Sequence, residues 1–94
     1  MTSTIKSGLQ VASYSNNYTL QASTVRTVTV TPSDLGMTGN IRTFATIVTT
    51  NEGRYNNYFM NWRNYVSGTG VTIYLYSAQA RTVPITVTVL YEED

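Results

Sequence analysis

Apolar and polar residues alternate along much of this chain, most regularly near its C-terminal end. Every second residue of the segment 83–91 is apolar, namely Val83, Ile85, Val87, Val89 and Tyr91. A period of two places the apolar side chains on one face of a β-strand and the polar side chains on the other. Residues 71–76 show the same pattern, and the short connection 77–82 between the two segments predicts an antiparallel hairpin.

Three further strands are predicted upstream, at residues 25–31, 41–50 and 55–66. In residues 41–50 we expect Phe44 and Val48 on one face, with Ala45 and Ile47 on the other. A strand that is apolar on both faces usually lies in the centre of a sandwich. Pro84 has no backbone N–H and is therefore expected at the start of its strand or on a sheet edge.

Turn-forming residues separate the predicted strands. Ser33–Gly36 favours one helical turn or a tight loop, in which Gly36 or Gly39 is free to adopt a positive φ. Residues 67–70 contain two glycines and predict a plain hairpin turn into the strand that follows.

The pattern as a whole predicts an all-β fold. Strands recur every 10–15 residues, and residues 9–11 and 18–20 add two weaker candidates. Since no segment has a helical period, we expect an antiparallel β-sandwich of about six or seven short strands. We expect residues 1–24 to form a partly flexible N-terminal segment or linker, and residues 25–94 to form the β-sandwich domain.

The distribution of apolar residues bears on the location of the protein. No segment approaches the ~20 apolar residues that span a bilayer, and residues 1–24 lack the apolar stretch of a signal peptide. We therefore expect neither membrane insertion nor a signal peptide. Release of a virus particle by lysis is one way for such a protein to reach the outside of a cell.

The residues that most enzymes use are scarce in this chain. Cysteine and histidine are absent, Lys6 is the single lysine, and Asp34 and Glu52 are the acids outside the C-terminal Glu92, Glu93 and Asp94. A catalytic base, a pair of carboxylates or a metal site would need these residue types. We therefore expect a protein that is not an enzyme and has no metal ion or cofactor.

Charge argues against nucleic acid as a partner. Six basic residues, five of them arginines, face two acids before residue 92. The arginines are spread along the chain, whereas proteins that bind nucleic acid usually carry a dense basic stripe. We interpret the arginines as solubilising and interface residues.

The segment 51–65 is rich in asparagine, arginine, tyrosine and tryptophan, the residue types that recognise sugars and protein epitopes. The candidate ligand-binding residues are Arg54, Asn56, Asn57, Asn61, Arg63 and Tyr65. In the alternative interpretation, Tyr58, Met60 and Trp62 belong to the core and the asparagines serve turns and strand faces. We favour a core position for Trp62 and expect Asn61, Arg63 and Tyr65 to point outward, and we leave both interpretations of Arg54, Asn56 and Asn57 open.

Two tyrosines are expected on an outer face. If Val71, Ile73 and Leu75 point inward, Tyr74 and Tyr76 point outward. Tyrosine and arginine are enriched at protein interfaces. We therefore assign Tyr74, Tyr76 and Arg42 to a subunit interface; a solvated sheet surface or a ligand platform are the alternatives for the two tyrosines.

Three segments resemble the C-terminal domains of phage tail fibre and baseplate proteins: residues 44–51, 65–76 and 83–91. The layout of residues 25–91 is also similar to H-type lectin-like sandwiches, although this chain has no cysteine for the disulfide typical of that family. The resemblance implies a homotrimeric, extracellular component of a virion, located in a tail or fibre, that binds a host-surface glycan or helps to assemble the fibre.

Two functions follow as hypotheses. The first is a virion-associated receptor-binding or adhesion domain that recognises a host-surface glycan or protein. The alternative is a structural trimerisation or decoration module of a phage particle, with no ligand of its own.

Overall fold

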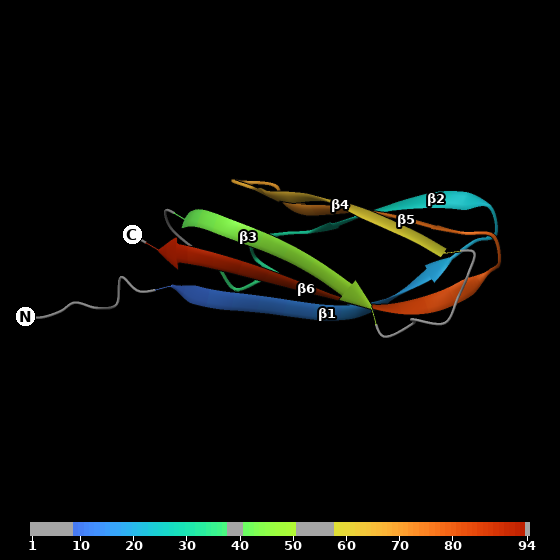
Figure 1. Cartoon of the computed structure of the whole chain (residues 1–94), viewed down its shortest axis with the longest axis horizontal. Helices are drawn as coiled ribbons and strands as arrows, with labels where there is room; N and C mark the ends of the chain where they lie inside the picture. Colours follow the sequence, from blue (N-terminus) through green and yellow to red (C-terminus); the bar gives the residue numbers. More distant parts are fainter. Residues whose placement is uncertain (1–8, 38–40, 51–57, 94) are drawn as a thin grey trace, which may run out of the picture.

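The computed structural model describes residues 9–37, 41–50 and 58–93, which form an all-β sandwich without a helix (Figure 1). Its strands in chain order are β1 (Gln10–Leu20), β2 (Thr24–Val30), β3 (Ile41–Thr50), β4 (Tyr58–Val66), β5 (Gly70–Ser77) and β6 (Arg81–Glu93). They form two three-stranded antiparallel sheets: sheet A, in the order β1-β6-β3, and sheet B, in the order β2-β5-β4. The predicted fold class is therefore confirmed.

Two of the connections between the sheets lie wholly within the described residues. Residues 21–23 join β1 in sheet A to β2 in sheet B, and residues 78–80 join β5 in sheet B to β6 in sheet A. The Ser23 N–H donates to the Ser77 carbonyl oxygen at 2.7 Å, so the two connections lie side by side. The hairpin predicted between residues 71–76 and 83–91 is therefore wrong, because each of these strands finds its partners in a different sheet.

The N-terminal strand is longer than the sequence indicated. In place of two weak strands there is one, β1, which pairs with β6 from Gln10, opposite Tyr91, to Leu20, opposite Arg81. Residues 10–20 thus form part of the sandwich. The next predicted strand, 25–31, is confirmed as β2 within one residue.

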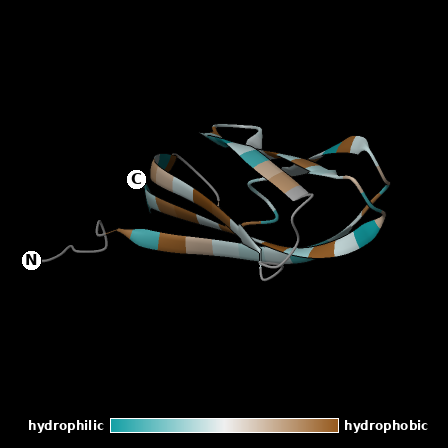
Figure 2. Cartoon of the chain, turned by 45° about the vertical axis from the view of Figure 1, so that its right-hand side comes forward, coloured by the Kyte–Doolittle hydropathy of each residue, from teal (hydrophilic) through white to brown (hydrophobic). Residues whose placement is uncertain are grey.

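The core lies between the two sheets and is built from alternate residues of their central strands. The side chains at 0–2% exposure are Leu20, Val30, Val71, Ile73, Leu75, Ser77, Val83, Ile85, Val87 and Val89. Figure 2 shows the alternation as successive brown and paler bands along the strands. Burying each large aliphatic side chain contributes about 1.5–3 kcal/mol, which makes this inner layer the main source of stability.

Pro84 lies in the central strand of sheet A, but in a part with one neighbour. The pairing of β3 with β6 ends where Thr50 meets Ile85, whereas β1 continues past Asn17, opposite Pro84. Among the described residues, the fourth residue of β6 therefore pairs with β1 alone, and the missing N–H removes no bond to β3. This agrees with the expected position near a strand start.

Strand β3 corrects two predictions. It pairs with β6 alone and is an edge strand, and its register shifts between Thr43 and Ala45. This bulge reverses the order of inward and outward residues. As a result Phe44 is 51% exposed and Val48 only 3%, so the two side chains do not share a face.

A compact loop after β2 closes one end of the core. The Thr31 N–H donates to the Asp34 carboxylate at 3.0 Å, and the Met37 N–H donates to the Pro32 carbonyl at 3.0 Å. Leu35 and Met37 are buried. The expected tight turn is confirmed, and Gly36 has the expected positive φ of 72°; Gly39 lies outside the described residues.

Candidate binding face on the outer side of sheet B

The alternation of β5 determines which side chains reach the outer surface of sheet B. Val71, Ile73 and Leu75 are fully buried, as expected, so Tyr74 and Tyr76 project from the opposite side of the strand. Tyr74 is 39% exposed. The predicted outward orientation of this tyrosine is confirmed.

Strand register places residues of β2 and β4 beside these tyrosines, because directly opposed residues in an antiparallel pair share a face. Three rows make up the surface, here called the aromatic face: Val25, Tyr76 and Phe59; Thr27, Tyr74 and Asn61; and Thr29, Thr72 and Arg63. The face thus combines three aromatic rings, two of them phenols, with an amide, a guanidinium and three threonine hydroxyl groups.

Apolar side chains on the aromatic face are exposed to an unusual extent. Phe59 is 66% exposed and Val25 59% exposed, on either side of Tyr76. The rings of Phe59 and Tyr76 lie 6.0 Å apart between centroids, at an interplanar angle of 44°. Exposed apolar side chains that gather in one place usually mark a surface that meets a ligand or another protein.

Polar groups on the same face can give direction to such a contact. The Asn61 side-chain oxygen accepts a hydrogen bond from the Trp62 N–H at 2.9 Å, which fixes the orientation of the amide. Arg63 is exposed two residues further along β4. None of the nine residues of the aromatic face is acidic, so the guanidinium gives the face a positive potential.

The predicted site residues separate into four groups. Asn61, Arg63, Tyr74 and Tyr76 come together on the aromatic face. Arg42 lies in sheet A opposite Glu92, and the closest side-chain atoms of this pair are 3.7 Å apart. Arg54, Asn56 and Asn57 lie outside the described residues. The assigned interface residues Tyr74 and Tyr76 are thus in a different sheet from Arg42.

Tyr65 points the other way from the expected direction. The register of β4 shifts between Arg63 and Val66, and this bulge turns the half-buried Tyr65 toward the core. Its backbone N–H donates to the Thr46 hydroxyl at 3.0 Å. The outward orientation predicted from simple alternation is therefore wrong.

Trp62 packs against the core, as favoured from the sequence. Its indole N–H donates to the Thr46 carbonyl oxygen at 3.2 Å. Because Thr46 is in β3 of sheet A, Trp62 and Tyr65 together tie the edge of sheet B to the edge of sheet A. This link holds β4, and with it Asn61 and Arg63, in place.

Phe59 and Val25 were not among the predicted site residues. The sequence did contain a signal for Phe59. Phe59 lies three residues before Trp62, and in a strand an odd spacing from a core residue places a side chain on the outer face. No comparable signal existed for Val25, because the pairing of β2 with β5 joins segments about 50 residues apart.

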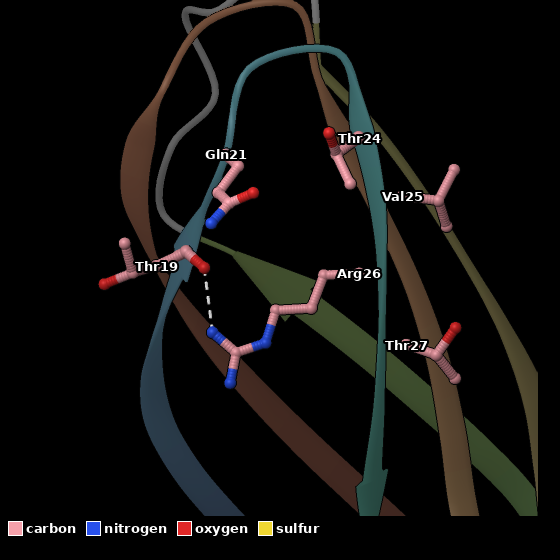
Figure 3. A pocket seen from close by; sticks show the side chains of 6 residues that line it. All are labelled: Thr19, Gln21, Thr24, Val25, Arg26 and Thr27. Carbon is pink, nitrogen blue, oxygen red and sulfur yellow. Dashed lines mark hydrogen bonds between the residues drawn. The ribbon is translucent and has the colours of Figure 1, made fainter.

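A pocket of about 410 Å³ adjoins the aromatic face where β1 and β2 diverge, and its walls are Thr19, Gln21, Thr24, Val25, Arg26 and Thr27 (Figure 3). Arg26 is its charged residue and donates from Nη1 to the Thr19 carbonyl oxygen at 2.8 Å. The guanidinium carbon also lies 5.4 Å from the centre of the Tyr18 ring. Burial raises the pKa of the Tyr18 phenol, which keeps this ring neutral beneath the arginine.

Residues 9–37, 41–50 and 58–93 show neither a cluster of metal-binding side chains nor a membrane-spanning helix. These residues hold no group of three or more histidine, cysteine, aspartate or glutamate side chains that could bind a metal ion. Nor does this part of the chain contain a helix long and apolar enough to cross a membrane.

The groups gathered on the aromatic face can stack against a flat ligand and donate hydrogen bonds to it. The function must be argued from this geometry, because no family model, no curated protein and no solved structure matches the chain.

Proposed function

We propose that the protein is a virion-associated adhesion domain that binds a host-surface glycan through the aromatic face. The observation that carries the proposal is the grouping of Phe59, Tyr74 and Tyr76 on one outer surface, beside Asn61 and Arg63. The virion setting rests on the resemblance to phage tail fibre and baseplate domains. As part of the same proposal, the protein acts by binding and is not an enzyme.

The chemistry of a sugar fits this surface. One side of a pyranose ring presents C–H groups that pack flat on an aromatic ring, while its hydroxyls need directed hydrogen bonds. The rings of the aromatic face supply the first, and Asn61 and Arg63 supply the second. Rigid aromatic side chains lose little conformational entropy on binding, which favours such contacts.

The site is open, so each contact is expected to be weak. A homotrimer would compensate, because three linked faces bind a cell surface with much higher avidity than one. We therefore include trimer formation in the proposal.

The test compares two exposed phenylalanines on edge strands of opposite sheets. Phe59→Ala and Tyr74→Ala should each weaken binding to glycans identified on an array by about fivefold, since one aromatic contact contributes about 1 kcal/mol. Phe44→Ala, a matched control on sheet A, should leave the affinity unchanged in isothermal titration calorimetry. Equal losses in all three variants, or none, would overturn the assignment of the site.

A second candidate function is assembly of copies of this chain, and a separate surface favours it. On the outer side of sheet A, Val11, Leu90 and Ala45 form one row across the three strands, and Ile47 lies in the next row. Val11 and Ile47 are more than half exposed. An apolar surface of this kind suits contact with a second copy.

Light scattering on the purified protein tests assembly directly. We expect a trimer at micromolar concentration, and expect Val11→Lys and Ile47→Lys to convert it to a monomer while Thr49→Lys, on the same side of β3, does not. A wild-type monomer would contradict both the trimer and the assembly function, but would leave glycan binding by a single copy to be measured.

A further inference from the structure

We propose that the pocket around Arg26 is an anion subsite, and that the glycan bound by this protein carries a carboxylate or sulfate group. The inference rests on the proposed function, because the pocket would extend the aromatic face. It adds the chemical class of the ligand, which the aromatic face alone leaves open.

The position of the pocket links it to the aromatic face. Strand β2 is an edge strand of sheet B and forms the wall between the two sites. Figure 3 shows the Arg26 side chain reaching from β2 toward β1, whereas Val25 and Thr27 point to the opposite side of β2. A glycan on the aromatic face therefore meets the pocket by crossing a single strand.

The guanidinium is held in place before any ligand arrives. Its Nη1 donates to the Thr19 carbonyl oxygen at 2.8 Å, and its central carbon lies over the Tyr18 ring, 5.4 Å from the ring centre. Tyr18 itself is buried, with 8% of its surface exposed. An arginine has five N–H donors, so a group fixed in this way still presents a fork that matches two oxygens of a carboxylate or sulfate.

The surroundings of Arg26 favour a negative ligand. Its five companions in the pocket wall are uncharged, and the Gln21 amide can add a hydrogen bond. Asp34, which contributes to the raised pKa of Tyr18, has its carboxylate bonded to the Thr31 N–H. The aromatic face contributes Arg63 and no acid, so the pocket and the aromatic face both carry positive charge.

The volume of the pocket fits this assignment. At about 410 Å³ it falls within the range of roughly 300–1,000 Å³ that small-molecule sites occupy in proteins. The space accommodates one sugar residue with its charged substituent, while neighbouring neutral sugars lie outside, toward β2.

The first experiment uses matched oligosaccharides that differ at the charged group: a uronic-acid oligosaccharide, its neutral methyl ester, and a sulfated analogue. The wild-type protein should bind the acidic form about tenfold more tightly than the ester, and the preference should shrink with added salt. Arg26→Gln should abolish the preference, so that the acid and its ester bind with equal affinity. Arg26→Lys should keep part of it, because the charge remains without the planar fork. Whichever of the carboxylated and sulfated compounds binds more tightly identifies the group.

A second experiment keeps this inference separate from the proposed function. Glucuronate alone and inorganic sulfate are titrated into the labelled wild-type protein, and NMR shifts of the amides of residues 19–27 are followed, with Arg26→Gln as the comparison. Saturable shifts in the wild type alone support the subsite even if no oligosaccharide binds the aromatic face. The inference is overturned if neither anion shifts these amides, or if Arg26→Gln responds as the wild type does while melting at the same temperature. If Phe59→Ala leaves oligosaccharide binding intact and Arg26→Gln removes the charge preference, the proposed face fails and the subsite stands.

Discussion

Gly70 lies where the start of β5 closely approaches the backbone at the end of β2. It begins β5 with a φ of 102°, a conformation that side chains with a Cβ rarely adopt. A Cβ at this position would overlap the Val30 carbonyl oxygen and approach the Thr31 Cα to 2.9 Å. Glycine is therefore required at position 70 for two reasons: it adopts this positive φ without strain, and it has no Cβ to collide with Val30.

Two substitutions separate these requirements. Gly70→Ala should destabilise the fold by about 3 kcal/mol, since backbone strain and overpacking each cost about 1–3 kcal/mol. Gly36→Ala is the matched control: its φ is 72°, but no atom lies within 4 Å of the added Cβ, so about 1 kcal/mol is expected. Urea denaturation measures both. Equal losses of unfolding free energy in the two variants would show that the close approach of Gly70 to Val30 does not affect stability.

The strands differ in how far the sequence could predict them. The alternation of β5 and β6 was evident because most of their inward residues are aliphatic and their pattern is unbroken. The orientations of Phe44 and Tyr65 were predicted wrongly because each lies in a bulge, and a single extra residue reverses every later side chain without a marker in the sequence.

Pairing between strands was the other limit. Tyr74, Tyr76, Asn61 and Arg63 were predicted to point outward, and the hairpin turn predicted at residues 67–70 placed β4 beside β5, but the sequence did not show the register that sets Asn61 opposite Tyr74. The Arg26 pocket was not predicted at all, because it forms where β1 and β2 part into different sheets. Such long-range geometry is decided by packing of the whole core and leaves little trace in local patterns.

The central strand of sheet A offers a test at the scale of an element. Pro84 is accommodated because that part of β6 pairs with β1 alone, whereas Thr88 has Ser13 on one side and Ile47 on the other. Thr88→Pro should therefore cost about 3 kcal/mol or more, or prevent folding.

The control is Pro84→Ala, for which we expect a loss of at most about 1 kcal/mol from the more flexible unfolded chain. Thermal denaturation followed by circular dichroism measures both variants. A stable, cooperatively folded Thr88→Pro protein would contradict the central position of β6.

The whole molecule presents two outer faces of different chemistry. Sheet B carries aromatic rings and Arg63, with the Arg26 pocket at its edge. Sheet A carries hydroxyl pairs between β1 and β6, with Ser15 to Thr86 at 2.8 Å and Thr19 to Thr82 at 3.1 Å between side-chain oxygens. Ligand recognition and assembly could thus use opposite sides of one small sandwich without competing.

The place of β6 in sheet A also sets an order of events during synthesis on the ribosome. Both β1 and β3 pair with β6 and not with each other. Until β6 emerges, the described part of sheet A has no strand pairing at all, whereas the β4–β5 hairpin can already close. A nascent chain stalled before residue 81 would therefore hold β1 and β3 as unpaired strands with exposed apolar side chains, and so depend on protection from aggregation at that stage.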